Sequence, residues 1–169
     1  MRSFLSKLRG RQNRTTAWQS VPTLRETLTV DLITHRFGGV APGELIDRLS
    51  FLGPADNCHE QTEIHDYKKR GFYLVEDDGR LEAVVFVLHA GPDVVPFVGR
   101  WVFDGRSRTI TSQTRPQDVR WDLGEPSRTE TEPDGELVWV YEFPGVEWEF
   151  AWSPEQALES VEMRLPGAG

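Results

Sequence analysis

Cysteine is nearly absent from this chain of 169 residues, since Cys58 is the only one. A single cysteine cannot form an internal disulfide, so the fold does not need an oxidising compartment. Long apolar runs are also missing, and no stretch approaches the roughly 18 residues that a membrane-spanning helix requires. The first residues are too charged to form the apolar stretch of a secretory signal. We therefore expect a soluble, cytoplasmic protein without a membrane span.

Motifs for catalysis and cofactor binding are lacking too. No Gly-rich loop between a strand and a helix carries the Lys that a phosphate-binding loop needs. Cys58, His59, His65 and Asp66 offer metal-ligating atoms close together, but no second pair of ligands stands elsewhere in the chain. We predict that these four residues are incidental, and that the protein has no metal, no cofactor and no catalytic residue.

Basic residues are concentrated at the amino terminus. The first 14 residues hold five basic residues and no acidic one, whereas the other 155 hold 14 basic and 27 acidic residues. The body therefore carries a charge of −13, the opposite of what phosphate neutralisation needs, so we do not expect it to bind DNA or RNA. We predict a basic, mobile arm over residues 1–18 and one globular domain over residues 19–169.

The arm also has an apolar side, formed by Phe4, Leu5 and Leu8. Four surfaces could receive such a segment: an anionic membrane, RNA, the protein's own domain or a sister chain.

The clearest structural pattern is a hairpin near the carboxyl end. Residues 137–143 and 146–152 flank Pro144-Gly145, which suits a tight turn. The two-residue loop sets the register and places Tyr141 opposite Trp148. Side chains alternate with period two, so one side of the ribbon carries a row of large apolar residues: Leu137, Trp139, Tyr141, Phe143, Val146, Trp148, Phe150 and Trp152. We predict that this side lies in the core and that the glutamate-bearing side faces water.

The same order of elements occurs twice. In each copy a short helix begins with Pro and ends near a Leu-Gly sequence, and a polar stretch then leads into a hairpin. The helices are predicted at 42–52 and 116–123, and the hairpins at 72–89, around Asp78-Gly79, and at 137–152.

Other segments are predicted less directly. A third hairpin pairs 97–103 with 106–114 around Asp104-Gly105, and residues 24–37 alternate as a strand does. Residues 55–70 could be a helix or not, and residues 154–163 are read as a turn before a last strand. The fold class is therefore α+β, with a curved antiparallel β-sheet of about seven to nine strands and two or three short helices on one face.

The order of helix, Leu-Gly-x-Pro and antiparallel strands resembles the tandem repeats of the beta-lactamase-inhibitor-protein-like and small outer-membrane-lipoprotein group. Leu123-Gly124-Glu125-Pro126 is the better match, whereas Leu52-Gly53-Pro54 is one residue shorter. The sub-repeats would span about 24–90 and 97–165. The resemblance implies a non-catalytic protein that binds other proteins through a sheet face. Proteins of that group are exported, whereas this chain shows no export signal.

One candidate contact surface lies on the predicted hairpin at 97–114. Trp101 faces Arg108 and Phe103 faces Arg106, so aromatic and arginine side chains lie together, as at many protein–protein interfaces. Stacking of arginine on tryptophan could instead serve only local stability.

A second candidate surface surrounds the helix predicted at 116–123. Trp121 lies about 160° from Val119 and Leu123 around this helix, so we expect it to point away from the core. An acidic rim follows in the sequence, formed by Asp122, Glu125, Glu130, Glu132, Asp134 and Glu136. Such a run is also typical of a solvated loop.

These features lead to three functional hypotheses. The first is a non-catalytic protein-binding domain, such as an immunity- or inhibitor-type protein whose acidic surface takes a basic partner. The second is a structural scaffold that forms homo-oligomers. The third is an enzyme or small-ligand carrier with a pocket between the two halves. We favour the first hypothesis.

Overall fold

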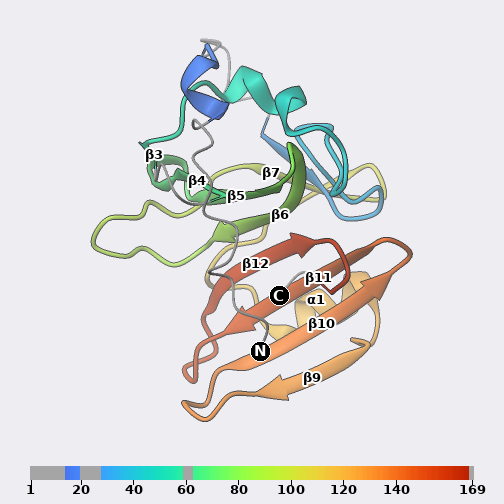
Figure 1. The fold of residues 1–169 in the computed structure, drawn as a ribbon. Coiled ribbons are helices and arrows are strands. Elements are labelled where there is room, and N and C mark those ends of the chain that lie inside the picture. Colours follow the sequence, from blue (N-terminus) through green and yellow to red (C-terminus); the bar gives the residue numbers. More distant parts are fainter. Residues whose placement is uncertain (1–13, 20–27, 59–62, 168–169) are drawn as a thin grey trace.

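The computed structural model describes residues 14–19, 28–58 and 63–167 (Figure 1). Their strands form two sheets. The larger has eight antiparallel strands in the spatial order β3 (Asn57–Cys58), β4 (Ile64–Tyr67), β5 (Phe72–Asp77), β6 (Arg80–Val87), β12 (Leu158–Arg164), β11 (Val146–Trp152), β10 (Leu137–Phe143) and β9 (Arg128–Thr131). The smaller has four strands in the order β2 (Arg36–Phe37), β1 (Thr29–Asp31), β7 (Arg100–Phe103) and β8 (Arg106–Arg108).

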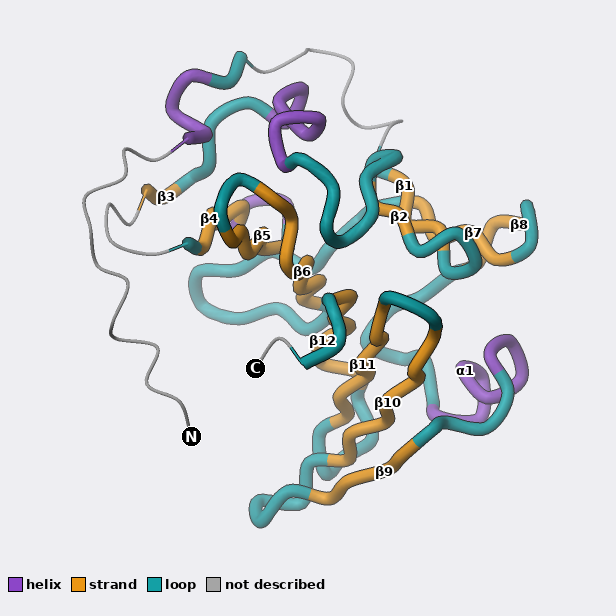
Figure 2. Tube along the Cα trace, turned by 45° about the vertical axis from the view of Figure 1, so that its right-hand side comes forward, coloured by secondary structure: helices purple, strands orange, loops and turns teal. Residues whose placement is uncertain are grey.

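The described helices are short. Three are 3₁₀ helices, η2 (Arg14–Ala17), η4 (Ile46–Leu52) and η5 (Lys68–Arg70), and one is an α-helix, α1 (Pro116–Leu123). The small sheet, η4 and α1 lie on one side of the curved large sheet (Figures 1 and 2). The main core fills the space between these layers, and its largest fully buried side chains include Trp101, Trp148 and Trp152. No helix or strand of the described residues covers the other side of the large sheet. We call this side the open face.

The carboxyl-terminal hairpin forms with the predicted register. Tyr141 pairs with Trp148 and Trp139 with Phe150 across β10 and β11. Trp148 and Phe150 are fully buried, and the Phe150 and Trp152 rings stack with centroids 6.0 Å apart. The prediction that this side of the hairpin faces the core is confirmed.

The opposite side of this hairpin is drier than predicted. Val138, Val140 and Ala151 form a small buried cluster there, separate from the main core. The register places Val138 between Glu130 of β9 and Ala151 of β11, and Val140 between Arg128 and Glu149. The prediction that this side is simply exposed to water is therefore wrong for its apolar positions.

Helix α1 has the predicted bounds. Pro116 is its first residue, and the Asp118 carboxylate accepts a hydrogen bond from the Arg115 backbone N–H at 2.9 Å. Gly124 ends it with a φ of 82°, which glycine adopts without strain. Val119 is buried and fixes the inner side of the helix.

The other predicted helix is shorter and of a different type. The chain is a turn at Pro42-Gly43, and only Ile46–Leu52 is helical, as a 3₁₀ helix. Backbone hydrogen bonds from Gly43 to Leu81 and from Leu81 to Glu44 hold this segment beside β6. The second bond uses the Glu44 carbonyl, an acceptor that a longer helix would have needed.

The predicted strand over 24–37 is interrupted. Its residues 24–27 lie outside the described residues, and β1 and β2 are separated by a turn at 32–35. The Asp31 carboxylate accepts the backbone N–H groups of Ile33 and Thr34, both at 2.9 Å, and this local bonding turns the chain. Strand β1 then pairs in parallel with β7, which the sequence analysis does not predict.

For three further segments the prediction from the sequence was left open or gave only approximate bounds. The described part of 55–70 forms β3, β4 and η5, and is not an α-helix. Residues 154–163 are a turn followed by the last strand, as predicted. The middle hairpin has its predicted turn at Asp104-Gly105 but shorter strands, β7 and β8.

The predicted arm falls mostly outside the described residues, which begin at Arg14. Residues 14–18 belong to the folded body, because Thr15 is fully buried and Trp18 is 7% exposed within the main core. The Trp18 ring lies 6.5 Å from that of His65 on β4. The boundary of the domain therefore lies before these residues and not after Trp18.

Candidate interaction surface

A row of charged side chains crosses the open face at the carboxyl-terminal half of the large sheet. The strand register pairs Glu147 on β11 with Arg164 on β12, and Glu149 with Glu162. Side chains of paired residues point to the same side of a sheet, so these four lie together. On β10 the register places Val140 opposite Glu149, on the same side. Polar and apolar side chains therefore alternate across this face.

One guanidinium holds three carboxylates in this row. Arg164 contacts Glu147 at 3.2 Å, Glu149 at 3.1 Å and Glu162 at 3.6 Å. With all four groups ionised the cluster has a net charge of −2. We call these four residues the Arg164 cluster.

The pKa shifts in the Arg164 cluster reflect this crowding. Burial raises the pKa of the Glu162 carboxyl; Arg164 lowers it, and Glu149 raises it again by repulsion. Burial alone would lower the pKa of Arg164, but the carboxylates of Glu162, Glu149 and Glu147 raise it. The arginine is therefore firmly charged, whereas Glu162 takes up a proton more readily than a free glutamate does.

The acidic rim adjoins this cluster. Burial raises the pKa of Glu136, and repulsion from Asp134, Glu159, Glu132 and Glu149 raises it further. Because Glu149 belongs to the Arg164 cluster, the same negative potential extends from the rim onto the open face. Glu132 and Asp134, two of the predicted contact residues, are exposed within it.

The two other predicted acidic residues are paired with arginines. Glu125 forms an ion pair with Arg120 of α1. Glu130 contacts Arg128 at 2.8 Å, and the same guanidinium contacts Glu142 at 2.9 Å. Their charges are thus partly neutralised within the protein.

Trp101 requires a correction. It pairs with Arg108 as predicted, but its indole is only 2% exposed and packs against Phe86 and Phe97, with ring centroids 5.1 and 5.7 Å away. The small sheet turns this side of β7 towards the core. Trp101 is therefore a core residue that no partner can reach in this conformation.

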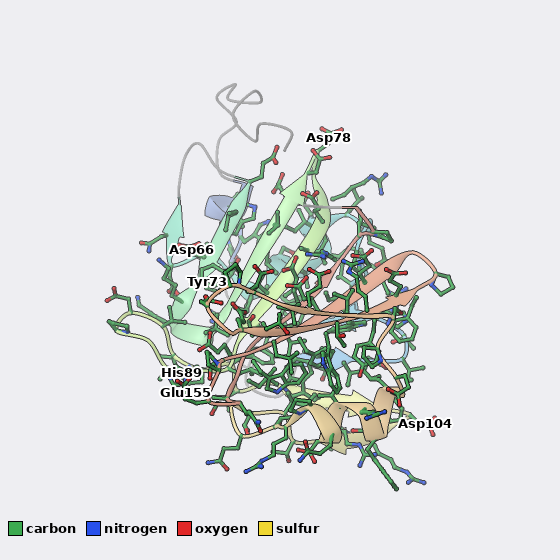
Figure 3. All side chains as sticks on the ribbon, turned by 90° about the horizontal axis from the view of Figure 1, so that it is seen from below. Asp66, Tyr73, Asp78, His89, Asp104 and Glu155 are labelled. Carbon is green, nitrogen blue, oxygen red and sulfur yellow. The ribbon has the colours of Figure 1, made fainter. Side chains whose placement is uncertain are left out.

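The predicted arginines next to it have different roles. Arg106 is exposed on β8. Arg108 forms an ion pair with Asp122 of α1 at 2.6 Å, and its guanidinium lies 5.8 Å from the centre of the Phe103 ring. Arg108 thus joins the middle hairpin to α1, whereas Asp104 is exposed at the turn of this hairpin (Figure 3).

Trp121 lies where the helix geometry predicts. Its side chain is 88% exposed on the outer side of α1. Helix α1, which carries Trp121, lies on the side of the large sheet opposite the open face, so Trp121 and the Arg164 cluster belong to separate surfaces (Figure 2).

The Arg164 cluster is not among the contact residues predicted from the sequence. The sequence does contain one sign of it, because Ser160, Glu162 and Arg164 alternate with Val161 and Met163 in the last strand and so share one side. The missing information is the pairing of β12 with β11, which contains a bulge between Ala151 and Trp152.

The residues considered for metal binding have other partners where they are described. Nε2 of His65 lies 2.8 Å from the Glu76 carboxylate, and both side chains are buried. Asp66, opposite Tyr73 on β5 (Figure 3), contacts Lys68 at 3.3 Å. His59 lies outside the described residues. Within the described ranges, no three His, Cys, Asp or Glu residues are grouped as metal ligands.

Comparison with known proteins shows similarity at the level of fold. Neither the protein-family models nor the curated proteins give a match to the sequence. The chain is similar to a crystal structure of a DUF4309 family protein (YjgB) from Bacillus subtilis, with a TM-score of 0.53 and 14% sequence identity. The match covers 76% of this chain and 84% of that one. In the described part of the chain, no helix has the length and apolar character needed to cross a membrane.

Proposed function

We propose that this protein is a non-catalytic binding domain that takes a basic segment of a partner protein on its open face. The observation that carries the proposal is the Arg164 cluster, in which three carboxylates share one guanidinium on a sheet face that no described helix or strand covers. A partner that supplies lysine or arginine side chains would neutralise the remaining charge. Inhibition of a basic enzyme, as an immunity-type protein does, is the biological role that fits this chemistry.

The charge of the whole body supports the same proposal. Residues 15–169 carry a net charge of −13, and the acidic rim continues the negative potential beyond the cluster. Such a field accelerates the encounter with a positively charged partner and disfavours a negatively charged one.

We also propose that the two halves of the large sheet are equivalent repeats. The strand order places β3–β6 and β9–β12 as two blocks that meet at the β6–β12 pair. Each block follows a short helix that ends at a glycine, and a tyrosine donates to the carbonyl of that glycine: Tyr67 to Gly53 at 2.8 Å and Tyr141 to Gly124 at 3.2 Å. In this arrangement the open face is one surface built by both halves.

The test is a comparison of captured proteins. The double variant Glu149→Gln with Glu162→Gln removes two negative charges from the open face and brings the Arg164 cluster to neutrality. The matched control, Asp78→Asn with Asp104→Asn, removes two exposed charges at the β5–β6 and β7–β8 turns, outside the Arg164 cluster and the acidic rim. Immobilised wild type and both variants are exposed to lysate of the source cells at low salt, and the retained proteins are quantified by mass spectrometry.

We expect a basic protein to be retained by the wild type and the control and to be reduced on the open-face variant. Exposed ion pairs contribute about 0.2–1 kcal/mol each, so losing two of them weakens binding about 2- to 30-fold. If no retained protein distinguishes the open-face variant from the control, the proposal is wrong.

A second candidate function is a self-associating scaffold, and the exposure of Trp121 favours it. An indole that is 88% exposed is typical of contact surfaces. Light scattering at high concentration tests this candidate, which requires an oligomer that Trp121→Ser dissociates. A strict monomer would rule it out.

A further inference from the structure

Strand β9 forms a free edge of the large sheet in the part of the chain that the structure describes (Figure 1). The backbone N–H of Glu132 donates to the carbonyl of Glu136, and the same register continues along β9 and β10. Hydrogen-bonded and non-hydrogen-bonded pairs alternate in an antiparallel ladder, so the even-numbered residues of β9 bond to β10. Thr129 and Thr131 therefore direct their backbone N–H and C=O groups outward. Such an edge can pair with a further strand.

The side chains of β9 are self-complementary in charge. All four residues of the strand are exposed, and Arg128 and Glu130 point to the same side because they are two residues apart. A second copy of β9 can pair antiparallel with Thr129 opposite Thr129. Arg128 of each copy then lies opposite Glu130 of the other copy. We infer that two copies of this chain pair through β9 in this register, about a two-fold axis between the two Thr129 residues.

Charge selects this register among those that use the outward backbone groups. With Thr129 opposite Thr131, Glu130 would lie opposite Glu130 of the other copy. With Thr131 opposite Thr131, Glu130 would lie opposite Glu132 twice in each dimer. Like charges directly opposite each other destabilise a strand pair. The register centred on Thr129 is the one that places each charged residue of β9 opposite a charge of the other sign.

The other edge strands of the described sheets fit a second copy less well. Strand β8 has Arg106 and Arg108 on one side, so pairing about its middle residue would place arginine opposite arginine. Strands β2 and β3 have only two residues each. Among the described edges, β9 is therefore the one that favours pairing with its own copy.

The contact is small, so the dimer should be weak. Arg128 already contacts Glu130 of its own strand at 2.8 Å and Glu142 at 2.9 Å. In the dimer it shares its charge with Glu130 of the second copy, so the charges mainly select the register and the backbone hydrogen bonds supply the attraction. A strand of four residues buries much less than the roughly 800 Å² per partner of a standard interface. We therefore expect the dimer at high protein concentration.

The pairing would leave the open face of both copies free. Opposite residues in an antiparallel pair point to the same side of a sheet, so the two open faces would lie on one side of a continuous sheet. A partner with two basic segments could then bind both faces and gain affinity from the second contact. This gain rests on the proposed function, whereas the pairing through β9 does not.

Analytical ultracentrifugation at up to about 1 mM protein tests the pairing. Thr129→Pro removes the outward N–H and none of the bonds to β10, and edge strands accept proline at such positions. Ser107→Pro is the matched control in the middle of β8. The two-residue turn makes Phe103 and Arg106 a hydrogen-bonded pair, so the Ser107 N–H also points outward. We expect a monomer–dimer equilibrium for the wild type and Ser107→Pro and a monomer for Thr129→Pro, with circular dichroism showing that all three are folded.

Charge exchange between two variants tests the register without a proline. Arg128→Glu and Glu130→Arg each place like charges opposite in two positions, so each alone should dimerise at least about 2- to 30-fold more weakly, as for the loss of two exposed ion pairs. In an equimolar mixture, a chain with two glutamates meets a chain with two arginines, and all opposing charges attract. We expect the mixture to form a heterodimer more tightly than either variant forms a homodimer. Adding Thr129→Pro to both variants should abolish this heterodimer.

Three results would overturn the inference: a strict monomer of the wild type at about 1 mM, a dimer that persists in Thr129→Pro, or no gain on mixing the charge variants. Dissociation by Trp121→Ser, with Thr129→Pro still dimeric, would assign the contact to α1 instead. A dimer without a captured partner would refute the proposed function alone. A captured partner with a chain that stays monomeric would refute the pairing alone.

Discussion

Replacement of Arg164 is the most direct perturbation of the open face. The variant Arg164→Met keeps the length and apolar contacts of the side chain but removes the charge that three carboxylates share. Breaking a buried ion pair costs about 3–5 kcal/mol because an unpaired charge remains. Arg164 and Glu147 are mostly buried, with side chains 16% and 12% exposed, whereas Glu149 and Glu162 keep about a quarter of their surface exposed. We therefore expect Arg164→Met to lower the free energy of unfolding by an amount near the lower limit, about 3 kcal/mol at pH 7.

The loss should depend on pH. Without the arginine, burial and repulsion from Glu149 raise the pKa of the Glu162 carboxyl further above its value in the unfolded chain. The folded state then binds more protons, so its disadvantage is complete above the folded pKa of Glu162 and decreases as pH falls through that value. Urea unfolding followed by circular dichroism, at pH 7 and at about pH 5, measures both effects.

Arg106→Met is the control, because Arg106 is an exposed arginine on β8 and its replacement should change stability by less than about 0.5 kcal/mol. A loss below about 1 kcal/mol for Arg164→Met, or an equal loss at both pH values, would refute the reasoning.

Three other predictions concern separate parts of the fold. Tyr67→Phe and Tyr141→Phe each remove one hydrogen bond to a glycine carbonyl, and urea unfolding should show similar losses of about 1 kcal/mol; a large inequality would argue against equivalent repeats. Burial lowers the pKa of His35, whose neutral Nδ1 accepts the Trp148 indole N–H at 2.9 Å. The contribution of neutral His35 to the stability of the fold is therefore complete above the unfolded pKa near 6.5, and it is lost as pH falls through the folded pKa. His35→Gln should flatten that pH dependence in thermal melts, and an unchanged slope would contradict it. Trp121→Ser should leave the melting temperature nearly unchanged, because its side chain makes little contact; a drop of several degrees would show that the indole supports the fold.

Local signals account for the elements that the sequence predicts correctly. Pro144-Gly145 and Asp104-Gly105 fix two hairpin registers, because a two-residue loop leaves one pairing. Pro116 and Gly124 delimit α1 in the same way. In each of these elements the residues that decide the structure are neighbours in the chain.

Long-range pairing accounts for what the sequence does not predict. The parallel pairing of β1 with β7 joins segments about seventy residues apart, and no local signal specifies it. For Trp101, the alternation of the hairpin gives two possible sides, and only packing against β6 decides that the indole is buried. The Arg164 cluster likewise depends on the register between β11 and β12, which are joined by a longer turn.

The proposed function depends most on the open face as the contact surface, and NMR shift mapping with the captured partner tests this directly. Amide signals of the full-length protein are followed during the titration. The account predicts that the largest shifts occur on β10, β11 and β12 around the Arg164 cluster. Shifts confined to α1 and the middle hairpin, with the signals of Glu149 and Glu162 unchanged, would contradict it.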